Sequence, residues 1–254
     1  MSDRIVVFLG PTLSAAEARS HLDALYLPPV SQGDVARAVL DHAPAAIVII
    51  DGVFAQRPAV RHKEILWAMA VGVRVFGASS MGAIRAAELD DCGMVGHGFI
   101  YRWYRRTPLA DDSDVAVPMA PPELGSSALG EALVDIRLTL RKAELEGVIE
   151  RRLRLALEQA ARALHFTDRT YERILSGDGL DLVDGNALSR LRDWICNGAV
   201  HQKKADAINL LAALSTTTEI SEKHQTYQHF ELTEALASDL QYSGLLGRIL
   251  RHKP

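Results

Sequence analysis

The chain has 254 residues, of which 48% are apolar and 24% are charged, and its formal net charge is −4. This length allows one large domain or two small ones, with enough core to fold without a disulfide or a metal. An acidic balance argues against a non-specific nucleic-acid binder, which would be basic overall. No apolar run approaches the roughly 20 residues that cross a bilayer. The two cysteines, Cys92 and Cys196, fit neither a zinc spacing nor a CxxC pair. We therefore expect a cytoplasmic protein that holds no metal and binds neither nucleic acid nor membrane.

Strand and helix signals alternate through the first 90 residues. Short apolar runs at 5–9, 46–50 and 73–76 predict buried strands. Helices are predicted at 14–25, 34–43, 59–72 and 81–89, the first with Ser14 as its N-cap. Apolar strands separated by helices predict an α/β fold: a short parallel sheet with flanking helices, Rossmann-like in its N-terminal part.

The pattern changes after Gly93. Aromatic and arginine residues alternate up to about residue 106, and a proline-rich segment follows. From 129 to about 164 the periodic apolar positions predict helix, and shorter helices are predicted at 168–175, 187–196 and 200–214. We divide the chain into an α/β core domain at 1–125, which carries the candidate active site, and a helical C-terminal region at 126–254.

A serine-containing turn follows the third predicted strand. Ala78-Ser79-Ser80-Met81-Gly82 has the small-x-Ser-x-Gly spacing of a nucleophile elbow, with alanine in place of the first glycine. Ser80 would then lie at a helix N-terminus, where free N–H groups favour a developing oxyanion. Helix capping by Ser79 or Ser80 is the structural alternative.

A nucleophilic serine needs a base, and Lys63 is one candidate. It lies in an otherwise apolar helical segment, so in a dry pocket its pKa would fall and leave a neutral amine. The alternative is a solvated lysine on an amphipathic helix. Asp51 directly follows a buried strand; it could orient Lys63, bind the substrate or form a turn.

The loop after the first strand, Gly10-Pro11-Thr12, only loosely resembles a phosphate-binding loop. The sequence contains neither GxxxxGK[ST] nor GxGxxG, so no nucleotide site is predicted. Its backbone amides could instead supply an oxyanion donor beside that of Met81. Gly52, at the end of the second predicted strand, is a further candidate substrate-binding residue.

Several segments of the sequence resemble the TfuA-like family. They are VVFLGPTLS, LPPVSQGD, IDGVF, HKEILWAMAVGVRVFGASSMGAIRAAEL and DCGMVGHGFIYRWY, and they span most of residues 5–120. The long block around Lys63 and Ser80 is far more specific than an isolated elbow. The C-terminal half carries little of the resemblance.

The resemblance implies a function in peptide backbone thioamidation beside a YcaO enzyme. TfuA-like proteins are described as hydrolases in which a Ser-Lys pair cleaves the thiocarboxylate of a small ThiS-like sulfur-carrier protein. They also help YcaO to engage its peptide substrate. By position, the pair would be Ser80, or Ser79, with Lys63, and this protein itself would need no cofactor. The competing hypothesis is a non-catalytic adaptor that binds YcaO and its peptide, with Ser80 as a cap and Lys63 in a structural role.

Overall fold

The computed structural model describes residues 5–55, 57–107, 110–176, 185–217 and 230–251. Its centre is a five-stranded sheet in which all neighbouring strands are parallel, in the order β2-β1-β3-β4-β5. The strands are β1 (Ile5–Phe8), β2 (Leu25–Leu27), β3 (Ala46–Ile49), β4 (Arg74–Ala78) and β5 (Val95–His97). The predicted α/β class with a parallel sheet is confirmed.

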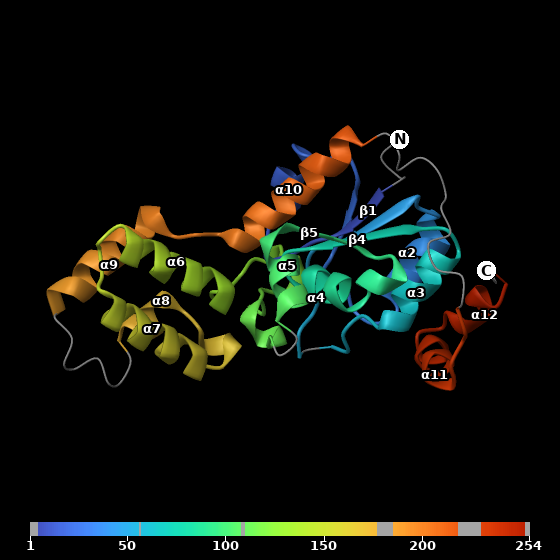
Figure 1. Ribbon diagram of the computed structural model, residues 1–254. Helices are drawn as coiled ribbons and strands as arrows, with labels where there is room; N and C mark the ends of the chain where they lie inside the picture. Colours follow the sequence, from blue (N-terminus) through green and yellow to red (C-terminus); the bar gives the residue numbers. More distant parts are fainter. Residues whose placement is uncertain (1–4, 56, 108–109, 177–184, 218–229, 252–254) are drawn as a thin grey trace.

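Helices cover both faces of this sheet (Figure 1). One face packs against α2 (Asp34–His42), α3 (His62–Ala70) and part of α4 (Met81–Glu88), and the other packs against α1 (Ala15–Arg19) and α10 (Gln202–Thr216). Side chains alternate between faces along a strand, so Val6 and Phe8 enter one core cluster and Val7 enters the other. Both faces are therefore dry, which explains why the strands are almost wholly apolar.

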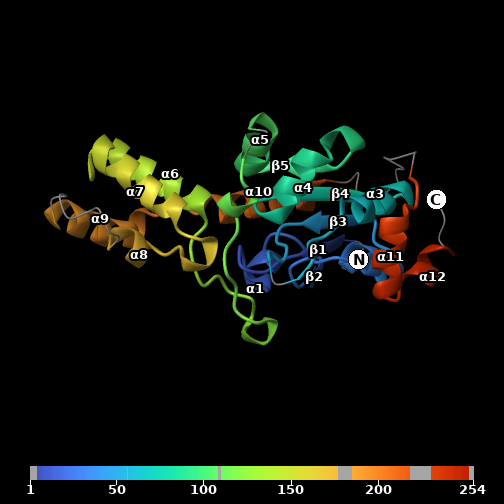
Figure 2. The ribbon, with the colours of Figure 1, turned by 90° about the horizontal axis from the view of Figure 1, so that it is seen from below.

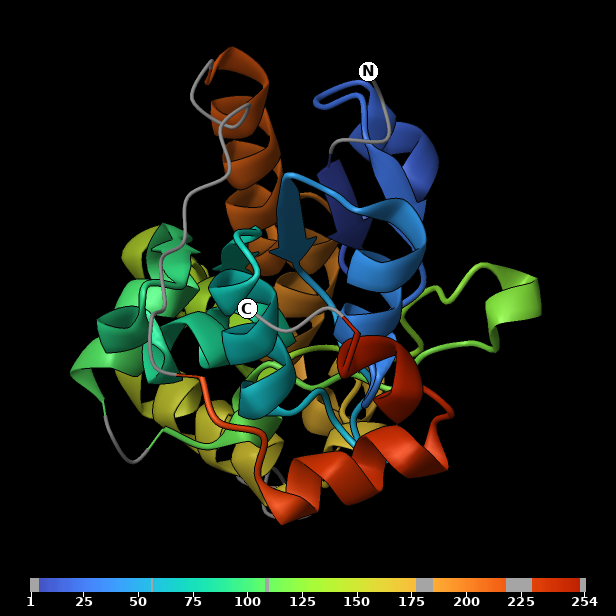
Figure 3. The same ribbon diagram turned by 90° about the vertical axis from the view of Figure 1, so that its right-hand side faces the viewer.

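The remaining helices form two groups. One extends away from the sheet, and the other packs on helices that cover the sheet. α6 (Leu133–Leu145), α7 (Arg151–Ala163), α8 (Tyr171–Leu175) and α9 (Gly185–Gly198) share one apolar cluster and extend away from the sheet (Figure 1). α11 (Glu234–Tyr242) and α12 (Leu246–Ile249) pack on α2 and α3 around Trp67 (Figure 3). α10 to α12 bury their apolar faces on the α/β part, and the domain boundary predicted after residue 125 stays a prediction.

Three predicted elements differ from those observed. The first predicted helix ends at Arg19, and the chain then forms the short edge strand β2. The segment after Gly93 forms β5 and α5 (Gly98–Arg106), although no regular element was predicted there. The long helix predicted at 129–164 is two helices, because Gly147 adopts a left-handed φ of 73° between α6 and α7.

Short 3-10 turns complete the fold, and one of them forms the tip of a projecting arm. They are η2 (Asp90–Cys92), η3 (Asp112–Asp114), η4 (Pro122–Leu124) and η5 (Phe166–Asp168). η4 lies at the tip of the arm, which leaves the body of the molecule in Figures 2 and 3. An isolated antiparallel bridge between Met119 and Ala128 closes the base of the arm. Within the described ranges, no helix is long and apolar enough to cross a membrane.

Glu64 is a buried carboxyl that links α3 to α2. Its Oε1 accepts hydrogen bonds from the Gly33 N–H at 2.7 Å and the Arg61 N–H at 3.4 Å, whereas Oε2 has no hydrogen-bond partner in the described part of the chain. Burial raises the pKa of Glu64 from 4.5 to about 7. The folded state therefore favours the protonated acid, and ionisation at neutral pH costs stability.

We expect the wild type to lose stability as the pH rises from about 4.5 to about 7, and we expect Glu64→Gln to abolish this loss. The folded protein binds the proton more tightly than the unfolded chain, so the unfolding free energy of the wild type falls as pH rises through this window. At 1.36 kcal/mol per pKa unit the change is about 3 kcal/mol at most. Urea unfolding at pH 4 and pH 8 measures it: the variant should gain stability over the wild type at pH 8 only. An equal difference at both pH values would contradict the assignment.

Candidate active site

Asp51 organises the carboxyl edge of the sheet. Its carboxylate is fully buried and follows β3. Oδ2 accepts from the N–H groups of Gly10 at 2.9 Å and Thr12 at 3.1 Å, and Oδ1 accepts from Thr12 Oγ1 at 2.6 Å. Asp51 thus fixes the loop that follows β1, the turn-forming role that was one of its three predicted alternatives.

These bonds correct the prediction of an oxyanion donor at 10–12. The amides of Gly10 and Thr12 donate to Asp51, and Pro11 has no N–H to offer. The two glycines are tightly packed on the side where a side chain would project. A Cβ on Gly10 would lie 2.3 Å from Pro29 Cγ, and one on Gly52 would lie 2.6 Å from Met81 Cγ. Gly10 and Gly52 are packing positions because side chains already fill the space beside them.

The serine turn between β4 and α4 has the tight geometry that the sequence predicted. Ser79 has a φ of 70°, a left-handed conformation that costs a non-glycine residue about 1–2 kcal/mol. A Cβ on Gly82 would lie 1.7 Å from the Ile49 carbonyl oxygen, so only glycine lets α4 start this close to β3. The strained residue is Ser79, although the elbow spacing favoured Ser80.

The two serines have different partners, and both are buried. Ser79 Oγ lies 3.4 Å from Thr12 Oγ1, which in turn donates to Asp51. Ser80 Oγ donates to the carbonyl oxygen of Val115 at 3.5 Å. Ser80 makes no side-chain cap to α4. The capping alternative therefore does not describe Ser80.

Lys203 is the amine that shares a hydrogen-bond acceptor with Ser80 in this structure. Its Nζ donates to the same Val115 carbonyl oxygen at 2.7 Å, and its side chain is buried. Burial lowers the pKa of Lys203, against the opposing effect of the carboxylates of Asp51, Asp135 and Glu131. Lys203 thus has the dry surroundings that the sequence analysis required of Lys63.

Lys63 lies on α3, and none of the described hydrogen bonds joins it to either serine. It is half-buried in the first turn of α3, and no hydrogen bond or ion pair joins its side chain to another described residue. Its neighbour His62 binds Glu88 through Nε2 at 2.8 Å, and Arg85 binds the same carboxylate at 2.6 Å. The pairing of Lys63 with Ser80 stays a prediction.

The N-terminus of α4 keeps one of the predicted oxyanion donors free. The Ser80 N–H donates to the Ala78 carbonyl at 2.9 Å. The Met81 N–H, in contrast, donates to no acceptor in the described ranges. Met81 is therefore the predicted donor that remains available beside Ser80.

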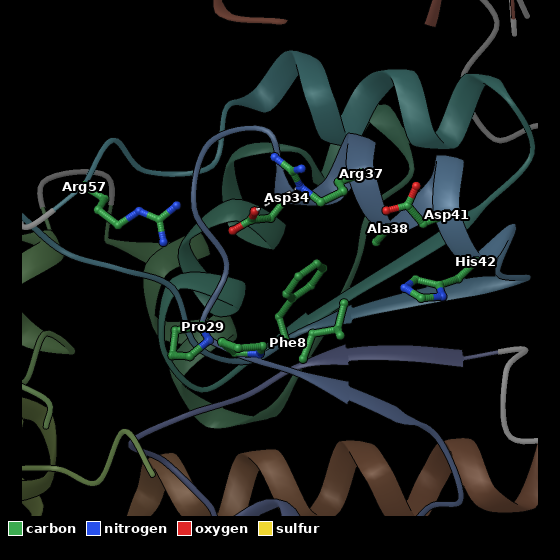
Figure 4. A pocket seen from close by; sticks show the side chains of 10 residues that line it. Phe8, Pro29, Asp34, Arg37, Ala38, Asp41, His42 and Arg57 are labelled. Atoms are coloured by element: carbon green, nitrogen blue, oxygen red, sulfur yellow. Dashed lines mark ion pairs between the residues drawn. The ribbon is translucent and has the colours of Figure 1, made fainter. Parts of the chain in front are cut away.

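A hollow in the surface lies away from both serines. It has a volume of about 260 Å³ and lies between α2 and the ends of β1 and β2 (Figure 4). Phe8 and Pro29 line its apolar side, and Arg37 and Arg57 lie around it. It contains none of the predicted site residues. In the described ranges, no group of three or more His, Cys, Asp or Glu side chains is arranged to hold a metal ion.

Fold and site together define an α/β protein with a serine turn and a buried amine at the carboxyl edge of a parallel sheet. Residues 51–170 match the family model of the TfuA-like proteins, which confirms the predicted resemblance: the chain carries a TfuA-like region that holds Asp51, both serines and Val115. A role linked to YcaO-type thioamidation follows from this family. No curated protein matches the chain.

Sequence reasoning missed Lys203 and Val115. Lys203 lies outside the matched region, in the segment HQKKAD, which reads as an exposed helix start. The signal that could have found it is the apolar face of α10, which includes Ala207, Leu210 and Leu214 and packs against the sheet. Lys203 lies four residues before Ala207 and therefore on the same side of the helix.

Proposed function

We propose that this protein is an accessory hydrolase that releases sulfide from the C-terminal thiocarboxylate of a ThiS-like carrier for a YcaO enzyme that thioamidates a peptide. The observation that carries the proposal is the convergence of Ser80 Oγ and Lys203 Nζ on the Val115 carbonyl oxygen. A Ser-Lys hydrolase needs a hydroxyl near an amine of lowered pKa, and the shared acceptor brings Ser80 and Lys203 to one carbonyl oxygen.

The reaction balances with groups of this chain, the carrier and water. Neutral Lys203 takes the Ser80 proton as Oγ attacks the thiocarboxylate carbon, and the Met81 N–H stabilises the oxyanion. The carbon–sulfur bond then breaks, and sulfide leaves as HS⁻ with the proton that Lys203 held. Water attacks the resulting ester with Lys203 again as base. The products are a carrier that ends in a carboxylate and free Ser80.

The Ser80→Ala variant tests this proposal. With a thiocarboxylated carrier as substrate, we expect colorimetric sulfide release to fall to the background rate, while binding to the YcaO partner is retained. Ser79→Gly is the matched control, because glycine accepts the left-handed φ of 70°. We expect it to keep its activity and to change the unfolding free energy by no more than about 1 kcal/mol.

Loss of sulfide release in Ser79→Gly, with release retained in Ser80→Ala, would place the nucleophile at Ser79. Sulfide release by Ser80→Ala at the wild-type rate, with Ser79→Gly also active, would reject serine catalysis. It would leave the adaptor hypothesis, in which the protein binds YcaO and its peptide without chemistry.

A further inference from the structure

The hollow lined by Phe8 and Pro29 lies at the carboxyl ends of β1 and β2, apart from the serine turn. Ligands of open parallel sheets bind at this end of the strands. Pro29 separates the hollow from the loop held by Asp51, because a Cβ on Gly10 would lie 2.3 Å from Pro29 Cγ. The volume of about 260 Å³ is close to the roughly 300 Å³ at which small-molecule sites begin. The hollow therefore has room for a compact ligand.

One side of this hollow is apolar and rigid. Phe8 and Ala38 are buried members of the core between the sheet and α2, and Leu27 packs against the same core. Pro28 and Pro29 add two rings that fix their own backbone φ. Figure 4 shows Phe8 in the middle of the hollow. Because aromatic rings pack well on one another, this side favours a flat apolar group.

Two arginines that line the hollow have hydrogen-bond donors to spare. Arg57 is exposed and makes no hydrogen bond or ion pair with another described residue. Arg37 is also exposed, and its Nε lies 4.0 Å from Asp34 Oδ1, which is beyond hydrogen-bond reach. In Figure 4 both arginines lie toward the end of the hollow marked by Asp34, and His42 lies toward the other end. A guanidinium binds a carboxylate through two parallel N–H bonds, so this end is suited to an anionic group.

The acidic side chains around the hollow limit the charge of its ligand. Asp34 Oδ2 accepts from the Ser31 N–H at 2.9 Å and from Ser31 Oγ at 2.6 Å. Asp41, beside His42, is paired with Arg248 at 2.7 Å. The two arginines and Asp34 therefore leave an excess of one positive charge at their end of the hollow. This excess matches a single carboxylate better than a doubly charged phosphate.

We propose that this hollow binds a small aromatic carboxylate, with its ring on Phe8 and its carboxylate held by Arg37 and Arg57. The lining residues include neither serine, nor Lys203, nor Asp51. The inference therefore goes beyond the proposed function and does not depend on the hydrolase activity.

Phenylacetate is the probe, and isothermal titration calorimetry with the full chain measures its binding. We expect a dissociation constant of about 1 mM or lower, which is within reach of a ligand of this size. Phenylacetamide has the same ring without the charge and should bind about tenfold more weakly, because hydrogen bonds to charged groups contribute more than neutral ones. Acetate, which lacks the ring, should bind at least about tenfold more weakly because it buries little apolar surface. Phenyl phosphate should bind no more tightly than phenylacetate.

Arg57→Met locates the binding site. This exposed substitution should weaken phenylacetate binding about tenfold and leave phenylacetamide binding unchanged. Arg152→Met is the matched control, because it removes an exposed arginine on α7 that has no ion pair with another described residue, and it should bind phenylacetate as the wild type does.

Four results would each overturn the assignment. They are no binding of phenylacetate to the wild type, equal binding of phenylacetate and phenylacetamide, equal binding of phenylacetate and acetate, and tighter binding of phenyl phosphate. Unchanged phenylacetate binding by Arg57→Met would overturn it as well, because the carboxylate would then bind elsewhere on the protein.

Discussion

Lys203→Met is expected to lower sulfide release by about 10²–10⁴-fold, the usual contribution of a general base. Methionine keeps an unbranched apolar side chain in the buried space but cannot accept the Ser80 proton. The Val115 carbonyl loses the donor that lies 2.7 Å away, while Ser80 Oγ remains its second partner. Initial rates of sulfide release from a thiocarboxylated carrier measure the effect, and circular dichroism checks the fold.

Two matched variants separate this role from other effects of removing a lysine. Lys204→Met removes the neighbouring lysine, which makes an exposed ion pair with Glu17, and should change the rate less than about twofold because such pairs contribute little. Lys63→Met should also leave the rate near that of the wild type, since none of the described contacts joins Lys63 to either serine. If Lys63→Met abolishes release and Lys203→Met does not, the base is Lys63, as the family resemblance implies.

The pH profile provides a second readout of the same assignment. Because burial lowers the pKa of Lys203, the wild-type rate should rise with pH and level off below the ordinary lysine value of 10.5. Asp51, Asp135 and Glu131 face this amine and oppose the shift. Asp135→Asn removes one of these negative charges, so it should move the rise of the rate to lower pH. A shift to higher pH would show that another group titrates.

The sheet could be predicted from sequence where strands are buried on both faces. β1 and β3 are continuous apolar runs, and β4 is apolar after Arg74, because helices cover both sides of these strands. The edge strands β2 and β5 have only three residues each and are at most partly buried, so neither carries an apolar run long enough to predict a strand. Their strand conformation comes from pairing with β1 and β4, which a local pattern does not encode.

In the candidate site, features that depend on residues adjacent in sequence were predictable, and contacts between residues far apart in sequence were not. The serine turn was predictable because its small residues and the following helix are adjacent in sequence. Lys203 meets Val115 across 88 positions of sequence, and Asp206 caps the N-terminus of α5 at Phe99 across 107 positions. Both contacts exist because α10 returns to the sheet, so they follow from tertiary packing and have no local signature.

Arg169→Met is expected to lower the unfolding free energy by about 3–5 kcal/mol, because three buried carbonyl oxygens lose their donor and each such loss typically costs about 1–3 kcal/mol. The guanidinium is buried and donates to three carbonyl oxygens, those of Ala161 at 3.1 Å, Ser113 at 2.8 Å and Leu164 at 3.1 Å. Methionine fills part of the volume but leaves these acceptors without their donor. Urea unfolding followed by circular dichroism measures the loss.

Arg173→Met is the control for this substitution. Arg173 lies four residues further on, is mostly exposed and pairs with Asp168 at the surface, so its removal should change stability by less than about 1 kcal/mol. A similarly small effect of Arg169→Met would mean that water replaces the lost donor and that the three carbonyls need no arginine.

If the effect is large, as expected, Arg169→Met should also release sulfide more slowly than the wild type at urea concentrations below its unfolding transition, where it is still folded. Arg169 holds the Ser113 carbonyl two residues before Val115, whose own carbonyl is the shared partner of Ser80 and Lys203. The same guanidinium would then support both the attachment of the helical group and the alignment of the site.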